Sequence, residues 1–301
     1  MSNASTSSLS TRNARSTFRS LLAGNEAVLA PLCLDALSAR IAADAGFHAG
    51  YVSGGALGYA MAVSEALLTL TEIADVSRNV VQRGGLPIIV DVGVGFGDAV
   101  HATRMIWEIE ATGAVAVELE DQVAPKRVSH HRGIEHLVDV ETMCAKLRHA
   151  VAARKDPDFL LIARTGAIAN EGFESAIARC QAYRAAGADM VMLLTNDEAQ
   201  WRQASAAIDA PLSTITTFGT RTPAQWHALG CALVIDPITP QVLAVQAVRD
   251  AYQRLRQDGS YGIESRAVFK LYKELPGLAG LDALYAIEDD TTERERTPPL
   301  H

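Results

Sequence analysis

Short apolar runs alternate with longer amphipathic segments along most of the chain. The apolar runs, which are rich in Val, Ile and Leu, are residues 27–33, 49–53, 86–92, 114–120, 158–165, 188–194, 211–217 and 231–237. The segments between them, for example 70–85 and 99–114, repeat apolar residues at helical spacing. Continuously apolar strands that alternate with helices predict a parallel sheet covered on both faces. Eight such repeats in about 210 residues favour a closed (β/α)8 barrel over a doubly wound sheet.

Glycines mark the ends of several predicted helices. Gly46, Gly113 and Gly187 each stand directly before a predicted strand. A glycine can adopt the left-handed conformation that closes a helix and turns the chain into the next strand. These positions therefore support the alternation of helices and strands.

Charge and composition narrow the class of protein. The 301 residues include 27 Lys and Arg against 35 Asp and Glu, a net charge of -8, without a basic block, which argues against a simple nucleic-acid binder. No apolar run approaches the roughly 20 residues that span a bilayer, so we expect no membrane partner. The four cysteines form no CxxC pair, which argues against a zinc ribbon or a disulfide framework and predicts a reducing, cytoplasmic location.

The ends of the chain differ from its middle in composition. Residues 1–15 are rich in Ser and Thr and basic, but no apolar segment of a secretory signal follows. A disordered leader and a transit peptide both fit this composition. We expect the barrel to occupy residues 16–258, a linker and a C-terminal helix to occupy 259–285, and an acidic, polar tail to follow over 286–301.

Polar residues gather where the predicted strands end. Active sites of (β/α)8 barrels lie at the carboxyl ends of the strands. These ends carry Ser53, Gly54, Gly55, Asp91, Glu118, Glu120, Asp121, Arg164, Thr165, Asn196, Thr216 and Asp236. Carboxylates of neighbouring strands can share a hard cation such as Mg2+, and an adjacent arginine can bind a substrate carboxylate or phosphate. The alternative is a structural salt bridge across the mouth of the barrel.

Four sequence motifs resemble those of a known family. Residues 34–58, 86–99, 117–131 and 158–167, in this order and spacing, resemble the isocitrate lyase/phosphoenolpyruvate mutase superfamily over roughly residues 16–275. The resemblance implies a (β/α)8 barrel, dependence on Mg2+ with Mn2+ as a substitute, and small 2-oxo- or 2-hydroxy-acid substrates that react through an enolate. It also implies a homo-oligomer, a tetramer built as a dimer of helix-swapped dimers, in which the helix over residues 266–277 packs on a neighbouring barrel.

The resemblance also assigns roles to single residues. Ser53, Gly54 and Gly55 match the backbone cradle for the substrate carboxylate, where glycines let main-chain N–H groups approach an anion. The remaining matches are Asp91 as the principal metal ligand and a substrate contact, Glu120 as a second ligand, Arg164 on a substrate carboxylate, and Lys126 on the gating loop. Tyr51 and Thr216, at the ends of their strands, complete the expected substrate-binding set.

Three positions depart from the superfamily pattern. Gly93 stands where a second metal-site acid is usual, and Gly166 stands where the A-R-T-D phrase has its Asp. Val128 occupies the loop position at which the lyases have a catalytic Cys and the mutase and hydrolase branch has Asn. A valine side chain can neither donate a proton nor form a hydrogen bond, so neither parent reaction transfers intact.

Neighbouring residues offer substitutes for the missing groups. Ser129 and His130 follow Val128 on the loop, and a histidine that titrates near neutral pH can supply or accept a proton. Glu118 lies two residues before Glu120, so both side chains face the barrel interior. It either supplements the acids of the site or is held there by a partner such as Arg164.

Three functions remain open from the sequence. The first is a Mg2+-dependent carbon–carbon lyase or decarboxylase for a small 2-oxo- or 2-hydroxy-dicarboxylate, such as an oxaloacetate, alkylmalate or methylisocitrate. Decarboxylation fits the missing Cys best, because release of CO2 does not strictly need an acidic Cys on the loop. However, the decarboxylase branch has a His after the last strand, where this chain has Asp236 and Pro237. The second is a P–C bond mutase or hydrolase for a phosphonate, and the third is a barrel that binds a di- or tricarboxylate without turning it over.

Overall fold

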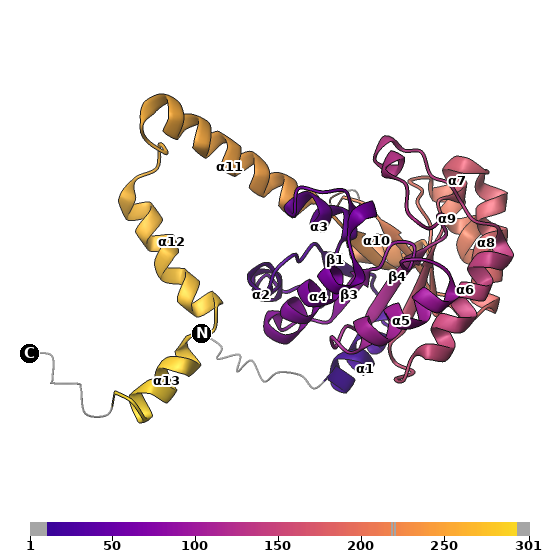
Figure 1. The fold of residues 1–301 in the computed structure, drawn as a ribbon, viewed down its shortest axis with the longest axis horizontal. Helices are drawn as coiled ribbons and strands as arrows, with labels where there is room; N and C mark the ends of the chain where they lie inside the picture. Colours follow the sequence, from indigo (N-terminus) through magenta and orange to yellow (C-terminus); the bar gives the residue numbers. More distant parts are fainter. Residues whose placement is uncertain (1–10, 218, 220, 294–301) are drawn as a thin grey trace, which may run out of the picture. The chain divides into compact units, whose positions relative to one another are not determined.

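The strands of the protein form one parallel, nearly closed barrel. The structure, a computed structural model, describes residues 11–217, 219 and 221–293. The strands are β1 (Val28–Pro31), β2 (Gly50–Val52), β3 (Ile88–Asp91), β4 (Ala116–Glu120), β5 (Leu160–Arg164), β6 (Met190–Met192), β7 (Leu212–Ile215) and β8 (Cys231–Asp236). They pair in the order β1-β8-β7-β6-β5-β4-β3-β2, and a bridge between Leu32 and Tyr51 brings the two ends of the sheet together (Figure 1). This confirms the predicted (β/α)8 architecture.

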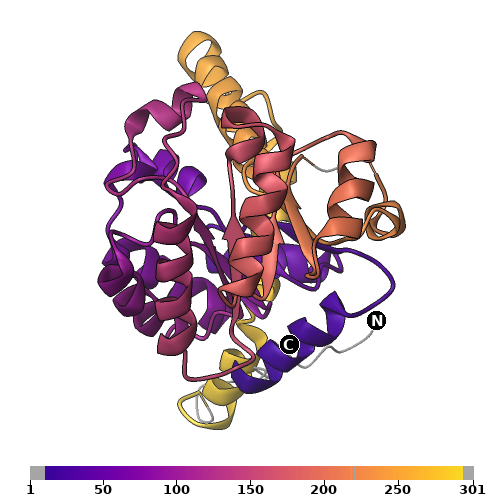
Figure 2. The ribbon, with the colours of Figure 1, turned by 90° about the vertical axis from the view of Figure 1, so that its right-hand side faces the viewer.

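Helices alternate with these strands, as the apolar pattern predicts. They are α1 (Thr11–Leu22), α2 (Ala36–Asp44), α3 (Gly54–Ala60), α4 (Leu70–Gly84), α5 (Ala99–Glu110), α6 (Val140–Ala153), α7 (Ala167–Asn170), α8 (Phe173–Ala185), α9 (Glu198–Ala207) and α10 (Pro223–Ala228), with 3-10 turns η1 (Glu65–Leu67) and η2 (Val128–Arg132). Helices α4, α5, α6 and α8 lie in sequence along the outside of the strands (Figures 1 and 2). Gly46, Gly113 and Gly187 have φ angles of 89°, 93° and 108°, so each adopts the predicted left-handed conformation between helix and strand.

The two faces of each strand contribute to different parts of the core. Ile89, Ala116 and Ile162 belong to the apolar cluster inside the barrel, whereas Val90 and Val117 pack beneath the helices. Because side chains alternate along a strand, later residues in phase with the inner set also face inward. The last inward positions of β3, β4 and β5 are therefore acidic or basic rather than apolar.

Helix α1 corrects the predicted boundary of the leader. Residues 11–15, assigned to the leader from composition, are helical and attached to the barrel. Arg15 is buried and donates hydrogen bonds to the carbonyl oxygens of Ala114 and Glu110, and Phe18 packs with the inner cluster. The Ser- and Thr-rich composition of residues 1–15 gave no indication of these two contacts. Residues 1–10 of the expected leader lie outside the described residues.

A second compact unit begins at residue 242. It contains most of α11 (Thr239–Asp258), together with α12 (Ser265–Leu278) and α13 (Asp282–Asp290). Helix α12 coincides with the predicted C-terminal helix, and the first residues of the expected polar tail, 286–290, are helical. Within the described part of the chain, no helix combines the length and the hydropathy that crossing a membrane requires.

Candidate active site

A buried charge cluster occupies the carboxyl ends of β3, β4 and β5. The strand register places Asp91 beside Glu118 and Glu120 beside Arg164. The guanidinium of Arg164 forms a fork, with Nη1 3.0 Å from Glu118 Oε1 and Nη2 2.5 Å from Glu120 Oε2. The arginine thus neutralises two carboxylates that have almost no solvent contact.

Glu118 is a structural partner of this arginine. Tyr51 donates a hydrogen bond of 2.5 Å to Glu118 Oε2, so both carboxylate oxygens have a protein partner. Burial raises the pKa of Glu118 to about 7, against the opposing charge of Arg164. Of the two roles considered for Glu118, the structure shows the one in which Arg164 holds it. The hydroxyl of Tyr51, expected on the substrate, is directed to Glu118.

Asp91 lies against the N-terminus of α3. Its Oδ2 accepts a hydrogen bond of 3.0 Å from the backbone N–H of Gly54, and its Oδ1 accepts one of 2.9 Å from Gly93. A Cβ atom on Gly54 would lie 3.2 Å from Oδ2, which explains why glycine suits this position. Burial raises the pKa of Asp91, and the nearby charge of Glu65 adds to this effect. Ser53 caps α3 by accepting a hydrogen bond from Ala56, so the predicted cradle and the predicted ligand are neighbours.

Glu65 is a site residue that the sequence analysis missed. Its carboxylate, on η1 after β2, forms an ion pair with Lys126 and lies 2.7 Å from His130 Nε2. Although burial opposes ionisation, the hydrogen bond from His130 and the charge of Lys126 lower the pKa of Glu65 to about 2. The only sequence signal was an acid between the second and third predicted strands, outside the four motifs that carry the family resemblance.

The loop after β4 enters the site through Lys126 and His130. Lys126 Nζ is also 2.5 Å from Glu120 Oε1, and despite burial these acids raise the pKa of Lys126. His130 contacts Glu65 through Nε2 and the carbonyl oxygen of Arg127 through Nδ1. Two acceptors suit a doubly protonated ring, and these hydrogen bonds raise the pKa of His130 against the effect of burial. Ser129 lies on the same turn, η2.

The cluster offers two side-chain ligands for a hard cation. Asp91 and Glu120 both lie close to Gly93: the Gly93 N–H donates a hydrogen bond to Asp91 Oδ1, and a Cβ on Gly93 would lie 3.9 Å from Glu120 Oε1. That oxygen is buried and receives no well-oriented hydrogen bond from the described residues. These oxygens fit Mg2+, which keeps substrate and water among its ligands. The described residues contain no group of three His, Cys, Asp or Glu side chains placed to hold a metal, so side chains alone do not complete the site.

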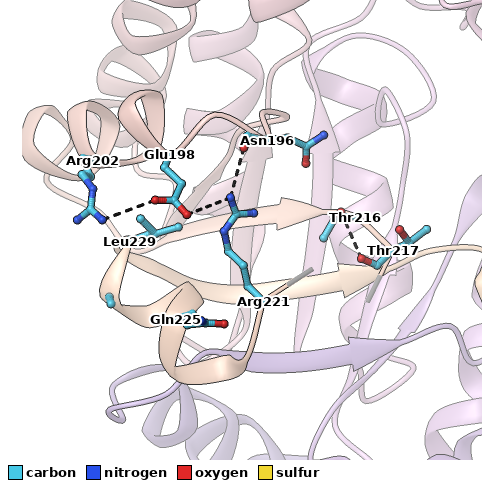
Figure 3. Close-up of a pocket in the computed structure, with 9 residues that line it drawn as sticks. Asn196, Glu198, Arg202, Thr216, Thr217, Arg221, Gln225 and Leu229 are labelled. Atoms are coloured by element: carbon cyan, nitrogen blue, oxygen red, sulfur yellow. Dashed lines mark hydrogen bonds and ion pairs between the residues drawn. The ribbon is translucent and has the colours of Figure 1, made fainter. Parts of the chain in front are cut away.

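Thr216 lines a cavity with residues of the segments that follow β6 and β7. This cavity of about 660 Å3 is lined by Asn196, Glu198, Arg202, Thr216, Thr217, Arg221, Gln225, Ala228 and Leu229. Figure 3 shows Arg221 reaching toward Glu198 and Asn196, with the two threonines to one side. The lining includes none of the buried acids of the charge cluster.

Fold and site together define a barrel enzyme whose polar groups converge at the carboxyl ends of its strands. Residues 18–256 match the family described as phosphoenolpyruvate phosphomutase, and the chain belongs to this family. This confirms the resemblance to the isocitrate lyase/phosphoenolpyruvate mutase superfamily.

The relatives of the chain include several carbon–carbon lyases. It is 32% identical to 2,3-dimethylmalate lyase of Eubacterium barkeri, over 88% of this chain and 95% of that protein. It is 37% identical to the probable 2-methylisocitrate lyase 2 of Corynebacterium glutamicum, over 81% of each chain. It is 32% identical to oxaloacetate decarboxylase of Chromohalobacter salexigens, over 87% of this chain and 92% of that protein.

Solved structures agree with the sequence relatives. A phosphonopyruvate hydrolase in complex with oxalate and Mg2+ superposes with a TM-score of 0.81 at 30% identity, covering 92% of this chain and 99% of the other. Phosphoenolpyruvate phosphomutase from Streptomyces platensis subsp. rosaceus gives 0.83 at 26% identity with the same coverage. The comparisons confirm the predicted class, an enzyme of the carbon–carbon lyase type within this superfamily.

Proposed function

We propose that the protein is a Mg2+-dependent lyase or decarboxylase for a small 2-oxo- or 2-hydroxy-dicarboxylate. The observation that carries this proposal is the cluster at the mouth of the barrel, in which the partly buried Arg164 and Lys126 lie against the buried Glu120 near Asp91. It combines carboxylate oxygens for a cation with fixed positive charges for an anionic substrate. Relatives named as lyases and a decarboxylase of small carboxylic acids support the same class.

Metal binding in this proposal rests on Asp91 and Glu120. When bound, Mg2+ would stabilise the negative charge that develops on an enolate oxygen as the C–C bond breaks. The buried Oε1 of Glu120, which faces Lys126 and receives no well-oriented hydrogen bond from the described residues, supports this assignment, as does a structural neighbour solved with Mg2+ and oxalate. Mn2+ also prefers oxygen ligands and is an expected substitute.

The remaining residues orient the substrate and exclude water. Arg164 stays cationic, because the acids around it outweigh burial and raise its pKa. We assign it to a substrate carboxylate, together with Ser53, Gly54 and Gly55 at the start of α3. Lys126 ties the β4 loop to Glu65 and Glu120, so closing the loop over the substrate excludes water from the enolate. In its doubly protonated form, His130 holds a proton at Nε2 that it shares with Glu65.

The residue at position 128, on the loop after β4, favours one class of substrate. Val128, with 55% of its surface exposed, offers no acid where the lyases have Cys. Loss of CO2 needs no proton donor for its leaving group, which favours a substrate of the oxaloacetate type. A phosphonate substrate is the alternative, supported by the retained Pro125 and Lys126 and by the phosphonopyruvate hydrolase neighbour.

One panel of substrates tests the proposal. The protein with Mg2+ is incubated separately with oxaloacetate, 2-methylisocitrate, 2,3-dimethylmalate and phosphonopyruvate, and pyruvate is followed by a coupled assay. We expect turnover of a carboxylate that EDTA abolishes and Mg2+ restores, and that Asp91→Asn removes. Release of phosphate from phosphonopyruvate alone would select the alternative. A panel without turnover, with oxalate binding unaffected by Mg2+ or Asp91→Asn, would leave a carboxylate-binding barrel.

Assembly and location complete the proposal. We propose a helix-swapped homotetramer in the cytoplasm. Helix α12 presents Phe269 and Tyr272, which are 63% and 65% exposed, and an exposed aromatic face of this kind needs a covering surface. All four cysteines are free and buried, which fits a reducing compartment. Light scattering of the full chain should give the mass of a tetramer, and Phe269→Asp with Tyr272→Asp should lower that mass.

A further inference from the structure

Glu135 occupies the space that Gly166 leaves open. A Cβ atom built on Gly166 would lie 1.7 Å from Glu135 Oε2, closer than any real contact. Gly166, two residues after the end of β5, is the position at which the superfamily motif A-R-T-D carries a carboxylate. In this chain a carboxylate stands at the same place but comes from the loop after β4.

The backbone holds Glu135 at the base of this loop. The Val123 N–H donates a hydrogen bond of 2.8 Å to the carbonyl oxygen of His136, and the Val138 N–H donates one of 2.9 Å to the carbonyl oxygen of Asp121. Between them, Gln122 and Leu137 form an antiparallel bridge. The returning limb of the loop is therefore paired with the segment that leaves β4, and this pairing fixes the position of Glu135.

The surroundings of Glu135 suit a carboxyl group that exchanges a proton. The side chain is partly buried, and no described residue donates a hydrogen bond to its carboxylate. Burial raises the pKa of Glu135, opposed by the charge of Arg164 and reinforced by Glu120 and Asp121, with Lys126 as a further positive neighbour. The other acidic group of the loop, His130, already shares its proton with Glu65.

We propose that Glu135 is the catalytic acid of this site, replacing the acid that Val128 cannot provide. This inference rests on the proposed lyase or decarboxylase function. Once the C–C bond has broken, its electron pair forms the enolate; the carboxyl proton of Glu135 then adds to the enolate carbon, giving the keto or carboxylic acid product and a carboxylate on Glu135. Water returns the proton when the loop opens, so the cycle needs no further reactant. A Cβ at position 166 would occupy the space in which this carboxyl group lies.

Glu135→Gln tests the role directly, with Glu141→Gln as the matched control. Glu141 lies on α6 with a side chain 79% exposed. We expect Glu135→Gln to lower kcat by about 100-fold or more with KM within about threefold, the range for a lost general acid. The fall in kcat at high pH, where wild-type Glu135 loses its proton, should disappear in this variant. Glu141→Gln should behave as wild type. A kcat for Glu135→Gln within threefold of wild type overturns the proposal.

Gly166→Ala tests the geometry, because a methyl group there must displace the Glu135 carboxyl. We expect Gly166→Ala to lower kcat, and to have no further effect in the Glu135→Gln background, since both changes remove the same group. Equal effects of Gly166→Ala in both backgrounds would show that the two residues act separately, which contradicts the inference. If wild type turns over none of the carboxylates, the proposed function and this role fall together. If wild type is active and Glu135→Gln is too, only the role of Glu135 falls.

Discussion

The ion pairs of Glu65 lead to a quantitative prediction about stability. Its carboxylate contacts Lys126 and His130 and has a side-chain exposure of only 11%. The pKa of Glu65 falls from the usual 4.5 to about 2 in the folded protein. At about 1.4 kcal/mol per pKa unit, this difference stabilises the folded state by about 3 kcal/mol at neutral pH.

Glu65→Gln removes the charge and nearly preserves the shape of the side chain. We expect the variant to lose about 3 kcal/mol of unfolding free energy at pH 7. Because the folded pKa is lowered, this stabilisation is complete above pH 4.5 and disappears as the pH falls toward 2. At pH 3 the difference between wild type and variant should therefore shrink to about 1.4 kcal/mol.

Urea unfolding followed by tryptophan fluorescence measures this difference. Trp201 and Trp226 are buried in the barrel, so their emission reports its unfolding. Glu108→Gln is the control, because Glu108 is exposed and lies 3.7 Å from Arg104 on the same helix, so its loss should change stability by less than about 0.5 kcal/mol. A loss below 1 kcal/mol for Glu65→Gln at pH 7, or a loss that is the same at pH 3, would refute the reasoning.

Three further substitutions probe the rest of the cluster. Arg164→Met leaves Glu118 and Glu120 buried without their partner, and should cost about 3–5 kcal/mol in urea unfolding at pH 8 but less at pH 5.5, where protonation neutralises Glu118. Tyr51→Phe removes the hydrogen bond to Glu118 and should cost about 1–3 kcal/mol at pH 8. In the wild type the pKa of Glu118 is raised to about 7, so the contribution of Glu118 to the free energy of unfolding falls as the pH rises from 4.5 through 7. This fall should be steeper in Tyr51→Phe. Gly54→Ala places a Cβ 3.2 Å from Asp91 Oδ2 and should weaken oxalate binding in calorimetry by about tenfold or more, whereas Gly277→Ala, with no atom within 4 Å, should bind as wild type.

Several features of the site depend on contacts that no local pattern encodes. Glu65 comes from the loop after β2 and meets Lys126 from the loop after β4 only because the barrel brings β2 and β4 to the same side of its mouth. Thr216 directly follows β7, as predicted, and it lines a cavity with Asn196 and Arg221, which come from different loops. Position at a strand end therefore selects candidates, and the paths of the loops decide which of them meet.

The sequence by itself determined the barrel and the buried acids. Each strand needs only a short apolar run, and the period of two that directs Ile89 inward directs Asp91 inward as well. The tertiary structure decided how those charges are paired: Arg164 is held by Glu118 and Glu120, and the carboxyl of Glu135 fills the space at Gly166. Periodicity is a property of neighbouring residues along the chain, whereas these pairings join residues 31 to 46 positions apart, whose separation only the folded backbone sets.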